Sequence, residues 1–177
     1  MTSEGSQKDQ KSSSPRDGDF LIALSGGCHW CTEGIFISLR GVTKVDQGWI
    51  KSTPPNGAWA EGVIVHYDPD IITAKDLIEV HLETHSSTGD HPLRWKYRSA
   101  IYYKNYQEEK DFRRWKTQLA QSFEEPILTQ ILLFVDFKLN KKSYLDYYRR
   151  NPDAPFCKRY ISPKLDRLRK NRPELMD

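Results

Sequence analysis

The chain has 177 residues, of which 37% are hydrophobic and 29% charged, a composition typical of one soluble globular domain with its own core. Its formal net charge is only +3, whereas nucleic-acid-binding proteins usually concentrate far more positive charge, so we expect no nucleic-acid partner. No apolar run approaches the ~20 residues that span a bilayer, and the N-terminal segment lacks an apolar signal region. These patterns predict no membrane association and a cytoplasmic location.

The cysteine content favours the same compartment. The chain has three cysteines, an odd number that does not suit a disulfide-stapled secreted fold. In a reducing compartment such thiols are catalytic, metal-binding or merely buried.

The chain begins with a segment that has no apolar period. Residues 1–17 are rich in Ser, Lys, Asp and Gln, so they are predicted to form a disordered N-terminal tail. Residues 18–177 are predicted to form a single domain. Its first element is a buried strand, from the dense apolar run at 20–24, and the apolar spacing at 28–39 then predicts a helix.

Strands and helices are mixed along the rest of the domain. Further strands are predicted at 42–50, 61–67, 97–103 and 127–134. Further helices are predicted at 73–85, 106–123 and 143–150, and the basic C-terminal stretch is expected to be the solvated face of a final helical turn or two. Because this order has no strict βαβ rhythm, the predicted fold class is α+β, a compact domain with a mixed, mainly antiparallel sheet and flanking helices.

Two glycines and two cysteines stand together at the junction of the first strand and the first helix, in the segment GGCHWCTE. Cys28 falls at the start of the helix, where free N–H groups and the positive end of the dipole favour its thiolate. The glycines allow a sharp turn and the close approach of a substrate. Cys31 lies one helical turn further along the same face, within reach of a disulfide with Cys28.

Three interpretations of this segment compete. In the first, the cysteines are small buried residues and the glycines form a simple turn. In the second, Cys28, His29 and Cys31 bind a metal, although no second pair with ligand spacing follows. The histidines that such a metal could recruit are His81, His85 and His91. In the third, Cys28 is a redox nucleophile that Cys31 resolves, and two thiols at such a junction favour this interpretation most.

The segment GGCHWCTEGIF resembles the Gly-Cys-Phe-Trp active-site element of the A-type, S-epimer-specific peptide-methionine sulfoxide reductases. Other segments resemble the same family in the same order, namely LRGVTKVDQGW, AWAEGVIVHYDP, YRSAIYY, EEPILTQI and YLDYYRRNPDAPFCKRYISPKL. The resemblance therefore covers nearly the whole domain. It implies the family's compact fold with a ferredoxin-like core and reduction of methionine S-sulfoxide, free or in peptides and proteins, to methionine.

The resemblance also implies a role for individual residues. Cys28 matches the nucleophile that attacks the sulfoxide sulfur, and Glu61 matches the acid that protonates the departing oxygen. A carboxyl group in a partly apolar site can keep a raised pKa and so hold that proton. Tyr97 matches a tyrosine that hydrogen-bonds the sulfoxide oxygen. Trp30 matches the aromatic wall of the pocket for the substrate methyl group.

The remaining steps implied by the resemblance involve a second thiol. The sulfenic acid formed on Cys28 condenses with a resolving cysteine, for which Cys31 is the first choice and Cys157, near the C-terminus, the rival. Thioredoxin, or dithiothreitol in the test tube, then reduces the disulfide. No prosthetic cofactor and no metal is expected.

The chain departs from the family's pattern near the expected site. His29 stands where the family usually has Phe, either as a flat ring filling the same space or as a group that tunes the Cys28 thiolate or contacts the substrate. Trp59 replaces a histidine before the acid and is a candidate pocket wall. The loops at 48–61 and 85–97 are short and lack family groups that bind the sulfoxide oxygen. Because these groups are missing, an alternative function is also considered: the protein would be a divergent paralogue that acts as a dithiol redox sensor or binding module.

Overall fold

The computed structural model describes residues 20–90 and 92–177, so the predicted tail at 1–17 and His91 lie outside the described residues. The strands in this part are β1 (Leu21–Ser25), β2 (Val42–Lys51), β3 (Ala60–Tyr67), β4 (Ala100–Tyr103), β5 (Gln130–Leu133) and β6 (Asp136–Leu139). The longer helices are α1 (His29–Ile37), α2 (Ala74–Thr84), α3 (Tyr106–Ala120) and α5 (Ser162–Asn171). The short helical segments are η1 (Lys142–Tyr144), α4 (Tyr147–Arg150), η2 (Cys157–Ile161) and η3 (Pro173–Leu175).

The six strands form one curled sheet in the order β5-β4-β1-β3-β2-β6. Only the β4–β5 pair is parallel among the ladders of the described strands, and the other neighbours are antiparallel. The prediction of an α+β domain with a mixed, mainly antiparallel sheet is therefore confirmed. The long β2–β3 ladder places Trp49 directly opposite Glu61, which brings the predicted acid to the face that carries the first helix.

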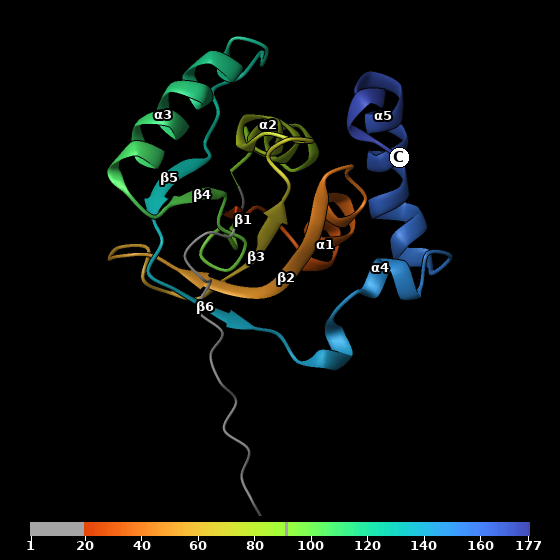
Figure 1. Cartoon of the computed structure of the whole chain (residues 1–177). Coiled ribbons are helices and arrows are strands. Elements are labelled where there is room, and N and C mark those ends of the chain that lie inside the picture. The colour runs from red at the N-terminus through yellow and green to blue at the C-terminus, as the bar shows by residue number, and fades with distance from the viewer. Residues whose placement is uncertain (1–19, 91) are drawn as a thin grey trace, which may run out of the picture.

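The main hydrophobic core lies between one face of the sheet and the helices. Alternate residues of β1 and β3, such as Leu24 and Val63, pack there with Ile35 and Phe36 of α1 and with apolar residues of α2. A smaller cluster lies on the other face around Tyr102. Figure 1 shows α4 and α5 lying beside α1, so that the last helices pack next to the first one.

Local signals explain where the elements begin, and they also explain where the predictions were wrong. Thr73 and Asp76 form a reciprocal capping box that starts α2, as the sequence predicts. The strand predicted at 97–103 begins only at Ala100. Residue 97 ends a turn, and the side chains of residues 98 and 99 form hydrogen bonds outside the strand ladder. The sequence also missed β6, and it underestimated α5, which has ten residues. Among the described residues no helix is both long and apolar enough to cross a membrane.

Candidate active site

The turn between β1 and α1 needs both of its glycines, for different reasons. Gly27 adopts a φ of 95°, a left-handed conformation that side chains disfavour. Gly26 packs so closely on α2 that a Cβ there would lie 2.7 Å from the His85 ring and 2.9 Å from His81 Nε2. The turn therefore presents Cys28 to the first helix in a fixed orientation.

Cys28 is the N-cap of α1, and its surroundings stabilise the thiolate. Hydrogen bonding from the Cys31 thiol is the largest cause of the lowered pKa of Cys28, and the backbone N–H groups of Trp30 and Cys31 act in the same direction. Lys164 of α5 adds a nearby positive charge. Although burial opposes these effects, together they lower the pKa of Cys28 to about 6.

The other two cysteines remain thiols at neutral pH. Hydrogen bonding to the Cys28 thiolate, burial and that same negative charge raise the pKa of Cys31. Cys157 lies in η2, fully buried, and burial raises the pKa of its thiol. It is close enough to Cys31 that its charge affects the Cys31 pKa. All three cysteines are unpaired, so the structure represents the reduced state.

Glu61, on β3, is a carboxyl group of which a large fraction stays protonated up to about neutral pH. Its pKa is raised to about 7, mainly by burial and then by the negative charge on Cys28, while Lys96 opposes both effects. Its Oε1 lies 3.2 Å from His29 Nε2, whereas its Oε2 is buried with no hydrogen-bond partner among the described residues. The carboxyl group therefore has one oxygen held by the protein and one oxygen left for another molecule.

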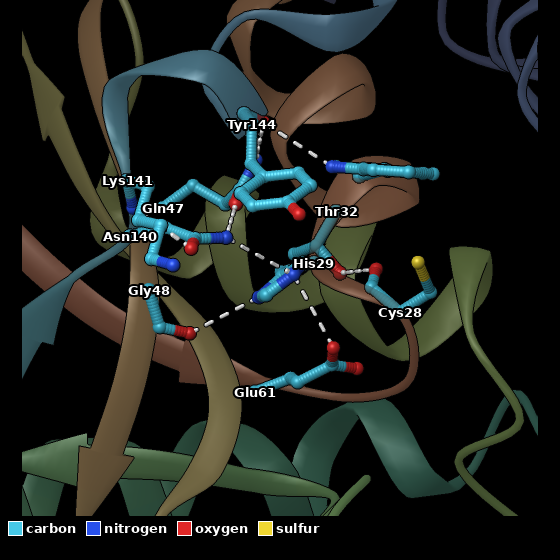
Figure 2. A network of polar contacts seen from close by, with 10 residues as sticks. Cys28, His29, Thr32, Gln47, Gly48, Glu61, Asn140, Lys141 and Tyr144 are labelled. Carbon is cyan, nitrogen blue, oxygen red and sulfur yellow. Dashed lines mark hydrogen bonds and ion pairs between the residues drawn. The ribbon is translucent and has the colours of Figure 1, made fainter.

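His29 follows the nucleophile, but its polar contacts are with the sheet and with Glu61 rather than with the Cys28 thiol. Its Nδ1 lies 3.2 Å from the Gly48 carbonyl oxygen, and its Nε2 faces Glu61 and the amide of Asn140 (Figure 2). The ring is buried against the edge of Trp49, at 5.5 Å between ring centroids. Burial lowers the pKa of His29, so the imidazole is neutral at pH 7.

Trp30 lies within a group of aromatic rings from the C-terminal part of the chain. It stacks on Tyr147 with ring centroids 4.2 Å apart and meets the Phe156 ring edge-on. Its indole N–H donates to the Tyr144 carbonyl oxygen at 3.2 Å. Glu33, one turn along α1, accepts a hydrogen bond from the Tyr147 N–H at 3.2 Å and so helps to hold that partner in place.

The two remaining predicted residues, Tyr97 and Trp59, each lie beside lysine side chains. Tyr97 is half-buried beside Lys96, whose charge also acts on Glu61. Trp59 is half-buried between Lys51 and Lys138, with Lys138 also covering Trp49. Of the predicted set, contacts or charge effects connect Cys28 with Cys31 and Glu61, Glu61 with His29, and Cys31 with Cys157. Tyr97 follows Lys96, whose carbonyl oxygen accepts a hydrogen bond from the Glu61 N–H at 2.9 Å.

The histidines of α2 serve the turn rather than a metal. His81 Nε2 donates to the Ser25 carbonyl oxygen at 2.9 Å, and His85 Nδ1 donates to the His81 carbonyl oxygen. Within residues 20–90 and 92–177 no three His, Cys, Asp or Glu side chains are arranged to hold a metal ion. His81 Nε2 and His85 Nδ1 are therefore occupied by hydrogen bonds, and His81 Nδ1 is buried.

Sequence reasoning missed the residues that connect this site to the end of the chain. Asn140 Nδ2 donates to Gln47 Oε1 at 2.7 Å, and Gln47 Nε2 donates to the Tyr144 carbonyl oxygen at 3.0 Å (Figure 2). Lys164, for which the sequence predicted no role, has a charge that acts on Cys28. No short-range pattern marks these residues, because their partners lie up to about a hundred positions away in sequence.

The site has the features of a thiol-dependent oxidoreductase. An ionised cysteine at a helix start stands next to a second thiol, and a buried carboxyl group nearby retains its proton.

Comparison with known proteins shows to which family of thiol-dependent oxidoreductases the chain is similar. The family model described as peptide methionine sulfoxide reductase matches residues 21–175. The peptide methionine sulfoxide reductase MsrA of Deinococcus radiodurans is 34% identical over 162 residues, which cover 82% of this chain and 79% of its own. MsrA 1 of Rhodopirellula baltica is 31% identical over 173 residues, which cover 88% of each chain. The crystal structure of Mxr1 from Saccharomyces cerevisiae in complex with Trx2 matches with a TM-score of 0.60 and 21% identity, over 74% of this chain and 88% of that one.

The chain therefore belongs to the peptide methionine sulfoxide reductase family.

Proposed function

We propose that this protein reduces the S-epimer of methionine sulfoxide to methionine, with Cys28 as nucleophile and Glu61 as acid. One observation carries the assignment of roles: the pKa of Cys28 is lowered to about 6 while that of Glu61 is raised to about 7. Near neutral pH the site therefore holds a thiolate and a neutral carboxyl group side by side.

The first step joins the sulfur of Cys28 to the sulfoxide sulfur. The thiolate supplies the electron pair, and Glu61 gives its proton to the sulfoxide oxygen as negative charge develops there. Collapse of this adduct breaks two bonds of the substrate sulfur, one to the oxygen and one to the Cys28 sulfur, while the oxygen, with its hydrogen, forms a bond to the Cys28 sulfur. The substrate sulfur is thereby reduced and the Cys28 sulfur is oxidised by the same two electrons. The collapse releases methionine and leaves the oxygen on Cys28 as a sulfenic acid.

The second step requires a neighbouring thiol, and Cys31 is the residue that we assign to it. Its thiol already donates a hydrogen bond to Cys28. Attack of the Cys31 sulfur on the sulfenic acid forms the Cys28–Cys31 disulfide and releases water, whose two hydrogens come from the Cys31 thiol and the sulfenic hydroxyl. Cys157 is fully buried behind Cys31, which suits a later exchange with that disulfide better than a direct reaction with Cys28.

The aromatic group around Trp30 supplies the apolar wall for the substrate methyl group. Trp30 is only half-buried although Tyr147 and Phe156 hold its ring, so part of the indole remains accessible to a ligand. Tyr97 is assigned to hydrogen-bond the sulfoxide oxygen, and Trp59 to the wall of the substrate pocket. No prosthetic group enters these steps.

Thioredoxin is the proposed reductant of the disulfide, with dithiothreitol as its substitute in the test tube. The related Mxr1 forms a complex with Trx2, which supports a partner of that kind. A protein that works through free thiols and a reducible disulfide suits the cytoplasm, and this location remains a prediction.

The test is a reduction assay with dithiothreitol and the separate S- and R-epimers of a dabsylated methionine sulfoxide. We expect product from the S-epimer only, and none from the Cys28→Ser variant. Cys157→Ser is the matched control, and with dithiothreitol it should retain activity.

Two outcomes would contradict the proposal. Turnover of the R-epimer alone would refute the stereochemical assignment. Absence of product from either epimer, with Cys28 still oxidised by peroxide to a disulfide with Cys31, would favour the alternative function of a dithiol sensor.

A further inference from the structure

His29 is the point at which the site departs from its family's pattern, and the structure gives it a defined chemical environment. The residue is only 7% exposed, and each of its ring nitrogens faces a polar atom of the sheet or of the segment after β6. A buried polar ring of this kind is costly unless its hydrogen bonds are made. The partners therefore determine which nitrogen carries the hydrogen.

The tautomer of His29 follows from its neighbours. The Gly48 carbonyl oxygen can only accept, so Nδ1, at 3.2 Å from it, carries the hydrogen. Asn140 points its amide nitrogen at Nε2, at 3.4 Å. That amide cannot be turned round, because its oxygen accepts from the Lys141 N–H at 2.9 Å while its nitrogen donates to Gln47. Nε2 is therefore the bare nitrogen of a neutral ring.

This bare nitrogen also faces Glu61. Nε2 and Oε1 are 3.2 Å apart, and an ionised carboxylate at this distance would place its negative oxygen against the nitrogen lone pair. A hydrogen on Oε1 removes that repulsion and can use the Nε2 lone pair, which the longer Asn140 contact, at 3.4 Å, only partly occupies. Figure 2 shows the ring lying between Gly48, Asn140 and Glu61, with all three contacts made at once.

We propose that His29 is a positioning residue for the acid: its Nε2 accepts a hydrogen bond from the neutral Glu61 carboxyl group and so keeps that group protonated in the resting enzyme. A phenylalanine at this position has the same shape but no acceptor. The reactive role of Glu61 belongs to the proposed function, whereas the protonation of Glu61 can be measured without any turnover.

His29 would also restore the acid after each reaction. For transfer to the substrate, the carboxyl group turns about its last side-chain bond so that the protonated oxygen takes the place of Oε2, the oxygen without a protein partner among the described residues. When Glu61 then gives its proton to the sulfoxide oxygen, the O–H bond breaks and a carboxylate is left beside Nε2. A proton from solvent can then bind Nε2, and its transfer to Oε1 breaks the new N–H bond and restores the neutral pair. The cycle moves protons only and needs no oxidant or reductant.

Other charged groups act on the same pair. The Cys28 thiolate raises the pKa of Glu61, and Lys96, before β4, lowers the pKa of both Glu61 and His29. Lys138 of β6 lies over Trp49, the ring that packs on His29. These groups stay in place when only the His29 ring is changed, so the effect of Nε2 can be isolated.

The experiment is a pH titration of the protein with ¹³C-labelled glutamate carboxyl groups, followed by NMR. The Glu61 signal is identified by its loss in Glu61→Gln, and we expect its midpoint near pH 7. In His29→Phe, which keeps the ring and its burial but removes the acceptor, the midpoint should fall by about one unit, a tenfold loss of proton affinity. A midpoint that is unchanged or higher would overturn the proposal.

His66→Phe is the matched control. His66 also contacts a carboxylate, with Nε2 at 2.8 Å from Asp46 Oδ2, but at the other end of the β2–β3 ladder, so its loss should leave the Glu61 midpoint in place. A comparable shift in this variant would show that loss of any histidine moves Glu61 and would refute the specific role of Nε2.

A second measurement needs no variant. The ¹⁵N shifts of the His29 ring in the unmodified protein at pH 7 should report hydrogen on Nδ1 and none bound to Nε2. A ring with its hydrogen on Nε2, or a fully protonated ring, would overturn the proposal even if His29→Phe failed to fold.

The enzyme assay separates this inference from the proposed function. In His29→Phe the alkaline limb of the pH–rate profile for the first step should move down with Glu61, while the acid limb, set by Cys28, stays. Absence of sulfoxide reduction by the unmodified protein would refute the function and leave the titration valid. Normal reduction with an unmoved Glu61 midpoint would refute the role of His29 alone.

Discussion

The turn that carries the nucleophile and the C-terminal segment that surrounds it contribute to the site in different ways. In the turn, residues next to one another in sequence determine the chemistry: Gly27 supplies the bend, and Cys31 and two N–H groups stabilise the Cys28 thiolate. The C-terminal segment, residues 140–164, supplies neither the nucleophile nor the acid, and its one thiol, Cys157, is assigned only to a later exchange. It contributes the rings that hold Trp30, the amide that faces His29 and the charge of Lys164.

The difference indicates that residues next to Cys28 in sequence determine most of its reactivity, and that residues from the C-terminal segment change it only slightly. Hydrogen bonds from within one helical turn are short and directional, so they dominate the Cys28 pKa. A charge brought from another helix acts through partly solvated space and is weaker. Variants in the turn should therefore change the chemistry, and variants in the C-terminal segment should change substrate binding or make small adjustments.

The largest effect is expected from Cys31→Ala. This variant removes the hydrogen bond that contributes most to lowering the Cys28 pKa, so that pKa should rise from about 6 by roughly one to two units towards its ordinary value. Since the thiolate is the reactive form, the pH at which Cys28 alkylation by iodoacetamide is half-maximal should rise by the same amount. Catalytic turnover should also stop after the sulfenic acid forms.

Cys157→Ala is the control for that measurement, because Cys157 contributes nothing to the causes of the Cys28 shift. If both variants left the alkylation profile unchanged, local control of the nucleophile would be disproved. Continued thioredoxin-dependent turnover in Cys31→Ala would assign the resolving role to Cys157 instead.

A smaller effect is expected from Tyr147→Ala, which removes the ring stacked on Trp30 at 4.2 Å. An aromatic pair contributes about 0.5–1.5 kcal/mol beyond its buried area, so the KM for the sulfoxide should rise about 2- to 10-fold. Cys28 alkylation should not change. Tyr144→Phe keeps the backbone carbonyl that binds Trp30 and should behave as the unmodified protein does. A lower kcat with an unchanged KM would contradict the division between the two regions.

The same division explains how much the sequence could predict. The start of α1 after Cys28, the start of α2 after Thr73 and most strands follow from neighbours in sequence, and these positions agree with the structure. The strand β6 was missed because it is a four-residue edge strand with two charged residues and little burial contrast. The contact between Asn140 and His29 spans 111 positions, and only the folded sheet brings those residues together.

The smallest effect is expected from Lys164→Met, which removes a positive charge near Cys28 but keeps the length of the side chain. The pKa of Cys28 should rise by a few tenths of a unit, because a single half-buried charge acts weakly through a partly solvated path. The alkylation profile at low salt should show this rise, and high salt, which screens the charge in the unmodified protein, should remove the difference between the two proteins. Lys158→Met, an exposed lysine paired with Asp153 at 3.9 Å, should show no rise. If Lys164→Met shifted the profile as much as Cys31→Ala, the distant charge and not the adjacent thiol would control the nucleophile, and the order of the two regions would be reversed.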